Sequence, residues 1–559
     1  MSRQKDRLKD RETPMSSPDP SEGARRNTKP RGRSFGLVLG ATLALCGATA
    51  GSADNLLTGS TLTRDGSLGS EQVPLEIPGT GGVFDIGESH GSRPGGSNGI
   101  NLLHSFGVFE LASGDTANFH ADYPTENIVV RVPYSVTIIE GSLDTETGPN
   151  TNGANLYWLS PRGVIFGNDA TLDVGGSLAV STADSLAFGA DGETQTFEAH
   201  AEGQVPTLAT ARPEAFGFLG NASQRIVLNG SVLCGGNDIG CGGSPSRRRA
   251  VMGSITLEAG GIDLLEGAAI VASNQDVNLV ATDSIELSGF DPVDDRGSSI
   301  RINNRNTQAG GNITLTADRI HLTDGAAVIN LSQAGVESSG NIHLSATRGI
   351  RLDGSSEANM PIGSLILQNN FNDLVGISAR LQRGSADILT VGSAVDAAGS
   401  TGAITLEAPV IELQDGAEVT TFAYGRASAD ITLLASDRLE LSGRGRETPS
   451  DGSLASSSAV QSRNPGFGEA GARAGDIVVR AGDVVLRDGA SFAVDTAGRG
   501  HAGAILIEAD RLALLGESGL YSSSTATTAL LEENGLFGAV PGQAGRIDVR
   551  AESVRLSGA

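Results

Sequence analysis

The sequence is poor in lysine and in aromatic residues, and both shortages limit the functions open to it. All of its lysines lie before residue 30, at Lys5, Lys9 and Lys29. The rest of the chain can therefore hold neither a phosphate-binding Walker lysine nor a lysine Schiff base. Aromatic residues make up only 4% of the 559 residues and hydrophobic residues 38%, whereas glycines number 77. This composition is typical either of partial disorder or of a repeat fold with a narrow core and frequent tight turns.

Acidic residues outnumber basic ones beyond residue 34. Residues 1–34 hold ten Lys or Arg and five Asp or Glu, a net +5, so a total charge of −25 leaves −30 on the remainder. Because nucleic-acid backbones attract basic protein faces, this charge argues against a nucleic-acid partner.

The basic segment leads into the apolar run 35–53, FGLVLGATLALCGATAGSA. A positive segment, a short apolar stretch and small residues at 48–50 or 51–53 are typical of a secretory signal peptide. The alternative is a membrane anchor, but a span needs about 20 apolar residues, and this run is short and rich in glycine and alanine. We therefore expect residues 1–53 to be an n-region and signal peptide, and the protein to be exported.

Removal of a signal peptide would leave two cysteines, Cys234 and Cys241, in LCGGNDIGCGG. An even pair flanking a glycine-rich loop in an exported chain predicts a local disulfide. Two free thiols are the alternative. No second pair of ligands accompanies them, so we expect no metal site.

A repeat occupies the second half of the chain. Strong copies begin at Ile255, Ile313, Ile404 and Ile477, and weaker copies at Ile342, Ile431, Ile505 and Ile547. Seven residues after each strong start comes another β-branched residue, at Ile262, Ile320, Ile411 and Val484. A glycine follows twelve residues after the start, at Gly267, Gly325, Gly416 and Gly489. Three pairs of successive copies, at 313 and 342, 404 and 431, and 477 and 505, lie 29, 27 and 28 residues apart. A period of this size is typical of a solenoid.

The period within each copy favours strands over helices. In GNITLTADRIHL, Ile313 and Leu315 alternate with threonines, which indicates a half-buried strand. We expect an all-β fold, a single-stranded right-handed parallel β-helix of pectin-lyase-like architecture, with three short strands per coil and with residues 251–559 as its repeat region. Residues 442–475 and 516–545 are predicted to be loops. The last copy carries no cap, so its strand edge would be exposed unless coils continue beyond residue 559 or protect it elsewhere.

The block before the repeats has no copy of the template. It contains NGINLLHSFGVFELASGDTANF (98–119), ENIVVRVPYSVTIIEGSL (126–143) and ANLYWLSPRGVIFG (154–167). In this order the three strings resemble the N-terminal secretion domain of the filamentous haemagglutinin family, over roughly residues 75–220. The residues that carry the resemblance are Asn101, Leu102, His104, Phe106, Asn155, Leu156, Trp158, Pro161, Gly163, Ile165, Phe166 and Gly167.

One motif departs from the family's pattern. Ser160-Pro161-Arg162-Gly163 stands where the family has Asn-Pro-Asn-Gly. Pro161 presets its φ and Gly163 permits a positive φ, so the turn is expected to survive, with serine as the weaker cap. Arg162 puts in doubt any recognition through an asparagine. The motifs can also serve packing alone.

The resemblance implies two-partner secretion. It predicts that residues 54–250 form a haemagglutinin-type secretion domain that acts as secretion signal and folding seed. The partner would be an outer-membrane β-barrel transporter, and the chain a secreted or cell-surface adhesin that reaches the outside of a Gram-negative-type bacterium through the periplasm. As an adhesin, the protein would bind a host, cell-surface or carbohydrate ligand. The resemblance implies no cofactor.

No catalytic constellation stands out, and we expect no enzymatic activity. The seven histidines are scattered, and His321 and His343 occupy strand positions predicted to face solvent. The alternative function is a β-helical lyase or hydrolase, which needs acidic side chains gathered in one groove. The nearest local cluster is Asp291, Asp294 and Asp295, which also suits a polar turn. Aspartates at the glycine turns of the repeat (Asp324, Asp353, Asp415 and Asp488) are expected to serve those turns.

Overall fold

The computed structural model describes most of the chain beyond residue 55. Its residues are 56–68, 82–145, 149–190, 193–200, 212–218, 224–235, 251–291, 296–304, 310–332, 339–354, 365–370, 401–423, 427–443, 457–464, 473–496, 499–525, 527 and 540–558. The predicted signal peptide lies outside them. Among these residues no helix has the length and apolarity needed to cross a membrane.

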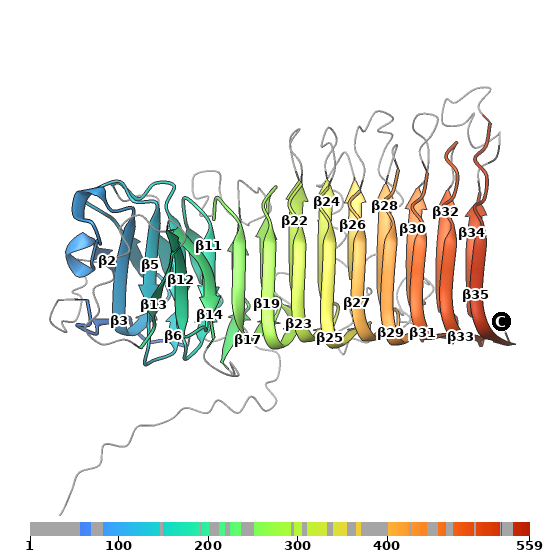
Figure 1. Cartoon of the computed structure of the whole chain (residues 1–559), viewed down its shortest axis with the longest axis horizontal. Coiled ribbons are helices and arrows are strands. Elements are labelled where there is room, and N and C mark those ends of the chain that lie inside the picture. Colours follow the sequence, from blue (N-terminus) through green and yellow to red (C-terminus); the bar gives the residue numbers. More distant parts are fainter. Residues whose placement is uncertain are drawn as a thin grey trace, which may run out of the picture. The chain divides into compact units, whose positions relative to one another are not determined.

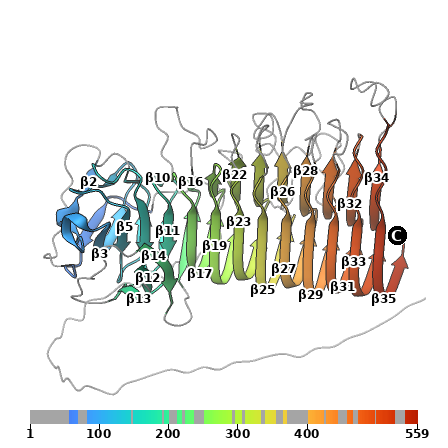
Figure 2. The ribbon, with the colours of Figure 1, turned by 45° about the horizontal axis from the view of Figure 1, so that its top comes forward.

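Residues 51–559 form one unit built of stacked coils (Figures 1 and 2). Each coil of the second half contributes one long strand and one short strand. The long strands are β17 (Ile255–Leu265), β19 (Val277–Leu287), β23 (Ile313–Leu322), β25 (Ile342–Asp353), β27 (Ile404–Gln414), β29 (Ile431–Ser442), β31 (Ile477–Arg487), β33 (Ile505–Leu515) and β35 (Ile547–Ser557). The short ones form a nine-stranded sheet of β16 (Val232–Cys234), β18 (Ala269–Ala272), β22 (Ser299–Asn304), β24 (Ala327–Ser332), β26 (Leu365–Asn370), β28 (Glu418–Ala423), β30 (Ala459–Asn464), β32 (Ser491–Thr496) and β34 (Gly519–Ser524). The all-β parallel solenoid predicted from the repeat is confirmed.

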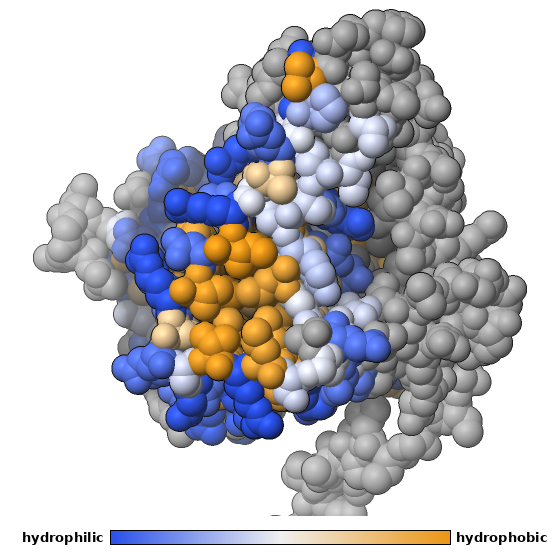
Figure 3. Space-filling model, turned by 90° about the vertical axis from the view of Figure 1, so that its right-hand side faces the viewer, coloured by the Kyte–Doolittle hydropathy of each residue, from blue (hydrophilic) through white to orange (hydrophobic). Residues whose placement is uncertain are grey.

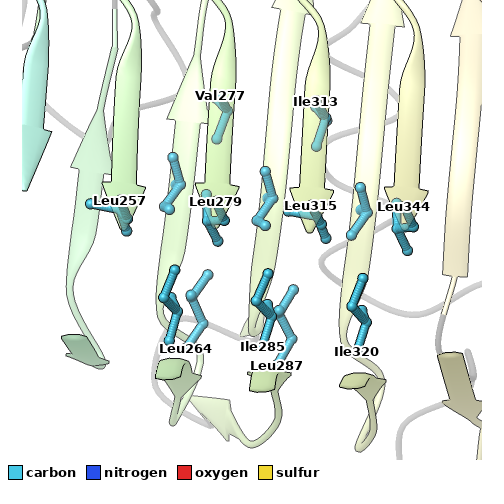
Figure 4. Packing of buried hydrophobic residues seen from close by; sticks show 14 of the residues in the cluster. Leu257, Leu264, Val277, Leu279, Ile285, Leu287, Ile313, Leu315, Ile320 and Leu344 are labelled. Atoms are coloured by element: carbon cyan, nitrogen blue, oxygen red, sulfur yellow. The ribbon is translucent and has the colours of Figure 1, made fainter. Parts of the chain in front are cut away.

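The predicted repeat starts all fall in one column. From Ile255 to Ile547 each start pairs in parallel with the equivalent residue of the next coil. The structure adds one copy that the sequence pattern missed, because Val277 stands in the column between Ile255 and Ile313. These side chains and those two residues on point inward and stack coil upon coil (Figure 4).

The spacing of seven residues is explained by a bend. A straight strand would place the second apolar residue on the opposite face, since seven is odd. In β17 the pairing register shifts between Ala259 and Gly261, so Ile255 and Ile262 both face the core. The first two strands expected in each coil are therefore one bent strand, and the expectation of three separate short strands is wrong in this respect.

A tight turn follows the bent strand where the repeat has Asp-Gly. Asp324, Asp415 and Asp488 have φ of 54°, 51° and 59°, and the glycine after each also has a positive φ. Two consecutive left-handed residues define the turn that Asp-Gly adopts readily. These three aspartates thus serve the turns, as expected. Asp353 differs, because it is the last residue of β25, has no positive φ and pairs with Arg351 at 2.9 Å.

The two predicted loops each hide a strand of the nine-stranded sheet. Residues 442–475 contain β30 and residues 516–545 contain β34. Both strands are polar in sequence, and Val460 and Leu520 are the main apolar side chains they turn toward the core. Their parallel partners in the preceding coils hold them as strands, which a local pattern does not reveal.

The N-terminal block consists of coils in the same register. Its strands in the main sheet are β3 (Asn101–Leu111), β5 (Asn127–Arg131), β6 (Thr137–Ile139), β8 (Asn155–Leu159), β9 (Val164–Phe166), β11 (Leu178–Ser181) and β15 (Arg225–Asn229). A separate four-stranded sheet consists of β2 (Val83–Ile86), β4 (Thr116–Phe119), β7 (Ser142–Asp144) and β10 (Thr171–Asp173). The remaining elements are β1 (Thr61–Arg64), the 3-10 helices η1 (Glu88–His90) and η2 (Gly96–Asn98), and the short hairpin strands β20 (Phe290–Asp291) and β21 (Arg296–Gly297). Leu102, Ile128, Leu156, Leu178 and Ile255 pair in sequence, so the inward column runs across residue 250 without a break. The domain boundary predicted between residues 250 and 251 stays a prediction, because the register of the coils does not change at that point.

A second core lies outside the N-terminal coils. An antiparallel sheet of β12 (Ser185–Ala190), β13 (Glu193–Glu198) and β14 (Arg212–Gly217) contributes side chains to this core. Outward residues such as Leu103 and Val129 pack with Leu186, Phe188 and Phe197. Because β3 and β5 are buried on both faces, their sequences lack the alternation seen in the repeats.

The final strand leaves apolar side chains exposed. Ile547, Val554 and Leu556 are 44%, 53% and 65% exposed, and Figure 3 shows an apolar patch on this end of the coil stack. Among the described strands, β35 pairs with β33 alone.

Cys234 ends β16 and is disulfide-bonded. Cys241 lies outside the described residues, so the pairing with Cys241 stays a prediction. Thiol labelling of the mature protein under denaturing, non-reducing conditions is expected to modify neither cysteine, and prior reduction is expected to expose both. Labelling of both without reductant would exclude the local bridge.

Candidate secretion site

The stretch 154–167 forms two strands of one coil. It runs through β8, turns at residues 160–163 and continues as β9. Leu156, Trp158 and Phe166 are buried in the main core. Ile165 is only half-buried, because β9 alternates and places Val164 and Phe166 inward. Ile165 therefore does not supply core.

Trp158 organises an aromatic cluster in the core of the first coils. Its ring meets Phe109 edge-on with centroids 4.7 Å apart, and Phe119 at 6.5 Å. Its indole N–H donates to the Thr137 hydroxyl at 3.2 Å, so the one polar group of the ring is satisfied. Thr137 thereby links two coils.

The turn after β8 is closed by Ser160 and Gly163. The Ser160 hydroxyl donates to the Gly163 carbonyl at 3.0 Å, and the Gly163 N–H donates to the Ser160 carbonyl at 2.9 Å. Gly163 has φ 111°, and a Cβ there would lie 3.1 Å from the Arg225 carbonyl oxygen of the next coil. Pro161 is buried, whereas Arg162 is exposed. Serine thus caps the turn, and Arg162 is free to vary without loss of packing.

Gly163→Val is expected to lower secretion strongly, at least tenfold. Valine disfavours φ 111°, and its side chain would also press on the next coil. The measurement is the amount of protein in the medium when the chain is expressed with its transporter. The matched control is Arg162→Asn at the exposed neighbour, which should secrete normally. Normal secretion of Gly163→Val would show that this turn does not matter for export.

Two of the predicted motif residues belong to an asparagine ladder. The Asn127 amide donates to Asn101 Oδ1, and the Asn155 amide donates to Asn127 Oδ1, each at 2.9 Å. Asn155 Oδ1 then accepts the backbone N–H of Ser177 at 2.8 Å. Each asparagine is the first residue of its strand, so the ladder fixes where successive strands begin. Sequence reasoning missed Asn127, although its position before IVVR was the available signal.

His104 lies fully buried beside the same aromatic cluster. Its ring stands 5.5 Å from that of Phe119, edge-on. Burial lowers the pKa of His104 to about 3, and the charges of His90, His120 and Arg93 act in the same direction. The histidine is therefore neutral in the folded protein at physiological pH.

This burial predicts acid sensitivity of the secretion domain. Since the folded pKa lies below 6.5, the unfolded chain takes up the proton first, and stability falls as pH drops from 6.5 toward 3, by at most about 1.4 kcal/mol per pH unit. His104→Leu is expected to flatten this dependence of stability on pH. The measurement is urea unfolding at several pH values, followed by the fluorescence of Trp158. His343→Gln on the outward face is the control. An unchanged slope in His104→Leu would show that this histidine does not carry the effect.

The remaining predicted residues lie in the same coils. Leu102 and Phe106 of β3 are fully buried in the main core. Gly167 allows a close approach, because a Cβ there would lie 2.7 Å from Glu140 Cγ. Glu140 was not singled out from the sequence, although it lies in the motif that ends at Leu143.

Of the acidic cluster considered for an enzyme, only Asp291 is described, and it lies in β20. β20 pairs with β21 antiparallel, and Asp291 lies 3.7 Å from Arg296 across it. Asp294 and Asp295 lie outside the described residues. Within the part of the chain that the structure describes, no three His, Cys, Asp or Glu side chains come together as a metal site.

Comparison with known families decides the identity of these coils. The model of the TPS secretion domain, the domain of two-partner secretion, matches residues 62–344. The chain belongs to the TPS secretion domain family. Exoproteins of this family are secreted across the Gram-negative outer membrane, and the TPS domain implies an outer-membrane transporter as partner.

Among solved structures, the HMW1 secretion domain from Haemophilus influenzae is similar. The alignment has 12% identity and a TM-score of 0.42, and covers 90% of this chain and 98% of that one. No curated protein matches. The TPS match extends past residue 250 into the repeat coils, in keeping with the unbroken column.

Proposed function

We propose that this protein is a secreted adhesin whose TPS domain acts both as the signal read by the β-barrel transporter and as the folding seed for the coils that follow. The observation that carries the proposal is the inward column from Leu102 to Ile547, in one register from the secretion domain to the last coil. Such a column lets each coil fold on the one before it.

Folding in this order supplies a direction for export. The periplasm offers no ATP, so another source of free energy must prevent back-sliding. A coil that has stacked outside the cell buries its apolar side chains and can no longer return through a narrow barrel. The first coils must therefore be recognised while extended and then fold without a preceding template, a role that the aromatic cluster around Trp158 suits.

A binding role suits the outward faces better than catalysis. Arg–carboxylate pairs link successive coils there, as in Arg511–Asp483 at 2.6 Å and Arg480–Glu508 at 3.0 Å. These carboxylates are taken up by arginines along the outer face, whereas a lyase or hydrolase needs carboxylates that converge on a substrate.

The adhesin role is tested with cells that export the chain. Cells that carry both chain and transporter are expected to adhere to a polysaccharide- or protein-coated surface, and cells without the transporter are not. Release of reducing sugar from the polysaccharide by the purified protein, without adherence, would favour the enzymatic alternative instead.

A further inference from the structure

Residues 56–68, here called the strap, contain β1, the only strand among the described elements that pairs antiparallel with the main sheet of parallel strands. Within the strap, β1 pairs antiparallel with β3, with Leu62 opposite Phe109. The opposite edge of β3 pairs in parallel with β5 and β6 of the following coil. The strap therefore covers the free edge of β3 at residues 106–110, while Ser92 bridges Leu103 on the same strand. Without the strap, residues 106–110 would be open to strand addition.

The first end of the strap is held by Glu140. The two carboxylate oxygens accept the backbone N–H groups of Leu56 and Leu57, at 2.6 and 2.9 Å. Glu140 is only 2% exposed. A buried carboxylate needs such donors, because removing its charge from water without them is costly. Gly167 leaves the space in which the Glu140 side chain lies.

The middle of the strap is anchored at the end of β3. Ser60 donates through its hydroxyl to Asp115 at 2.5 Å and accepts the backbone N–H of Ala112 at 2.8 Å. Two residues on, Leu62 enters the main core, where it is 2% exposed.

The far end of the strap joins a buried polar network. The Arg131 guanidinium donates to Ser67 at 2.7 Å and to Ser105 at 2.8 Å, and Asp65 accepts from both hydroxyls at 2.6 Å. Leu68 packs in the second core beside this network. The strap thus inserts one leucine into each core.

All of these anchors lie later in the chain than the strap. Glu140 follows Leu56 by 84 residues, and Arg131 follows Ser67 by 64. In a chain that emerges from its N-terminus, the strap comes out first, and its set of anchors is complete only once residue 140 has followed. Until then the strap lacks the carboxylate that holds its first end.

We propose that the edge of β3, between Glu140 and Arg131, is a binding site for an antiparallel strand, and that the strap is its exchangeable ligand. Resting on the proposed function, the site stays open while the secretion domain passes the transporter and closes once the first coils stand outside. Closure then seals the leading edge against strand addition by a second copy.

Strand exchange in a nicked protein tests the site without any transporter. A protease site inserted between residues 70 and 80 allows the folded mature protein to be cut, and gentle urea then removes the strap. A fluorescent peptide of residues 54–68 is expected to bind the stripped protein saturably, and the same peptide with Leu62→Asp at least tenfold more weakly. Glu140→Ala in the protein should also weaken binding at least tenfold, whereas Glu286→Ala on the outward face of β19 should not.

Absence of binding to stripped protein that keeps its Trp158 fluorescence would overturn the proposal, as would equal affinity of the Glu140→Ala protein. Should stripping unfold the protein, hydrogen exchange of the intact chain decides. Glu140→Ala is expected to speed exchange in residues 56–64 at least tenfold while β5 and β8 keep their protection. Equal acceleration in all three would reduce Glu140 to a general structural role. None of these outcomes depends on secretion, so they leave the proposed function to its own tests.

Discussion

Ile404→Asp is expected to destabilise the repeat region by roughly 3–5 kcal/mol. Ile404 is fully buried and stands in the inward column between Ile342 and Ile431. An aspartate there would place a carboxylate among stacked aliphatic side chains with no donor to receive it. Coils depend on their neighbours, so the loss is expected to open the adjacent coils as well.

Thermal and urea unfolding followed by circular dichroism measure the effect, and limited proteolysis locates it. Thr405→Asp is the matched control, because Thr405 lies next in the same strand but points outward and is half-buried. The control should unfold close to the wild type. If both variants unfolded alike, the inward register of β27 would be contradicted.

The inward column of the repeat coils could be predicted from the sequence because each copy contains the residues that define it. Each copy carries its own inward residues and its own Asp-Gly turn, so aligning the copies places Ile313 over Ile342 without any knowledge of the fold. The same local reasoning missed the bend at Ala259, since a spacing of seven shows only that the strand changes phase.

Features formed between distant segments were beyond that reasoning. β30 and β34 have polar sequences and are strands only because a neighbouring coil pairs with them. The second core joins Leu103 to Phe197, nearly a hundred residues later. Glu140 and Arg131 bind residues of the strap, which lies more than sixty residues earlier in the chain. The spacing of residues within their own motifs does not predict these contacts.

Deletion of residues 75–220 is expected to abolish secretion, leaving the protein in the periplasm. The deletion removes the Asn101–Asn127–Asn155 ladder and the aromatic cluster, and with them the proposed signal and the first coils. The remaining coils still carry the inward column, but the transporter would have nothing to recognise and the first coil nothing to fold on.

The control for this deletion is the removal of one repeat coil. Ile404 pairs with Ile431, so deleting residues 404–430 joins Ala403 to Ile431 and keeps the column in register. Secretion of this variant should continue at a level near that of the wild type, because the signal and the seed are intact.

The central claim, that residues 75–220 direct export and seed the coils, is tested most directly by measuring how the full chain and both deletions divide between medium and periplasm when the transporter is present. The account predicts the full chain and the chain without 404–430 in the medium, and the chain without 75–220 in the periplasm. Wild-type amounts of the last variant in the medium would contradict the claim, although the β-helix itself would stand.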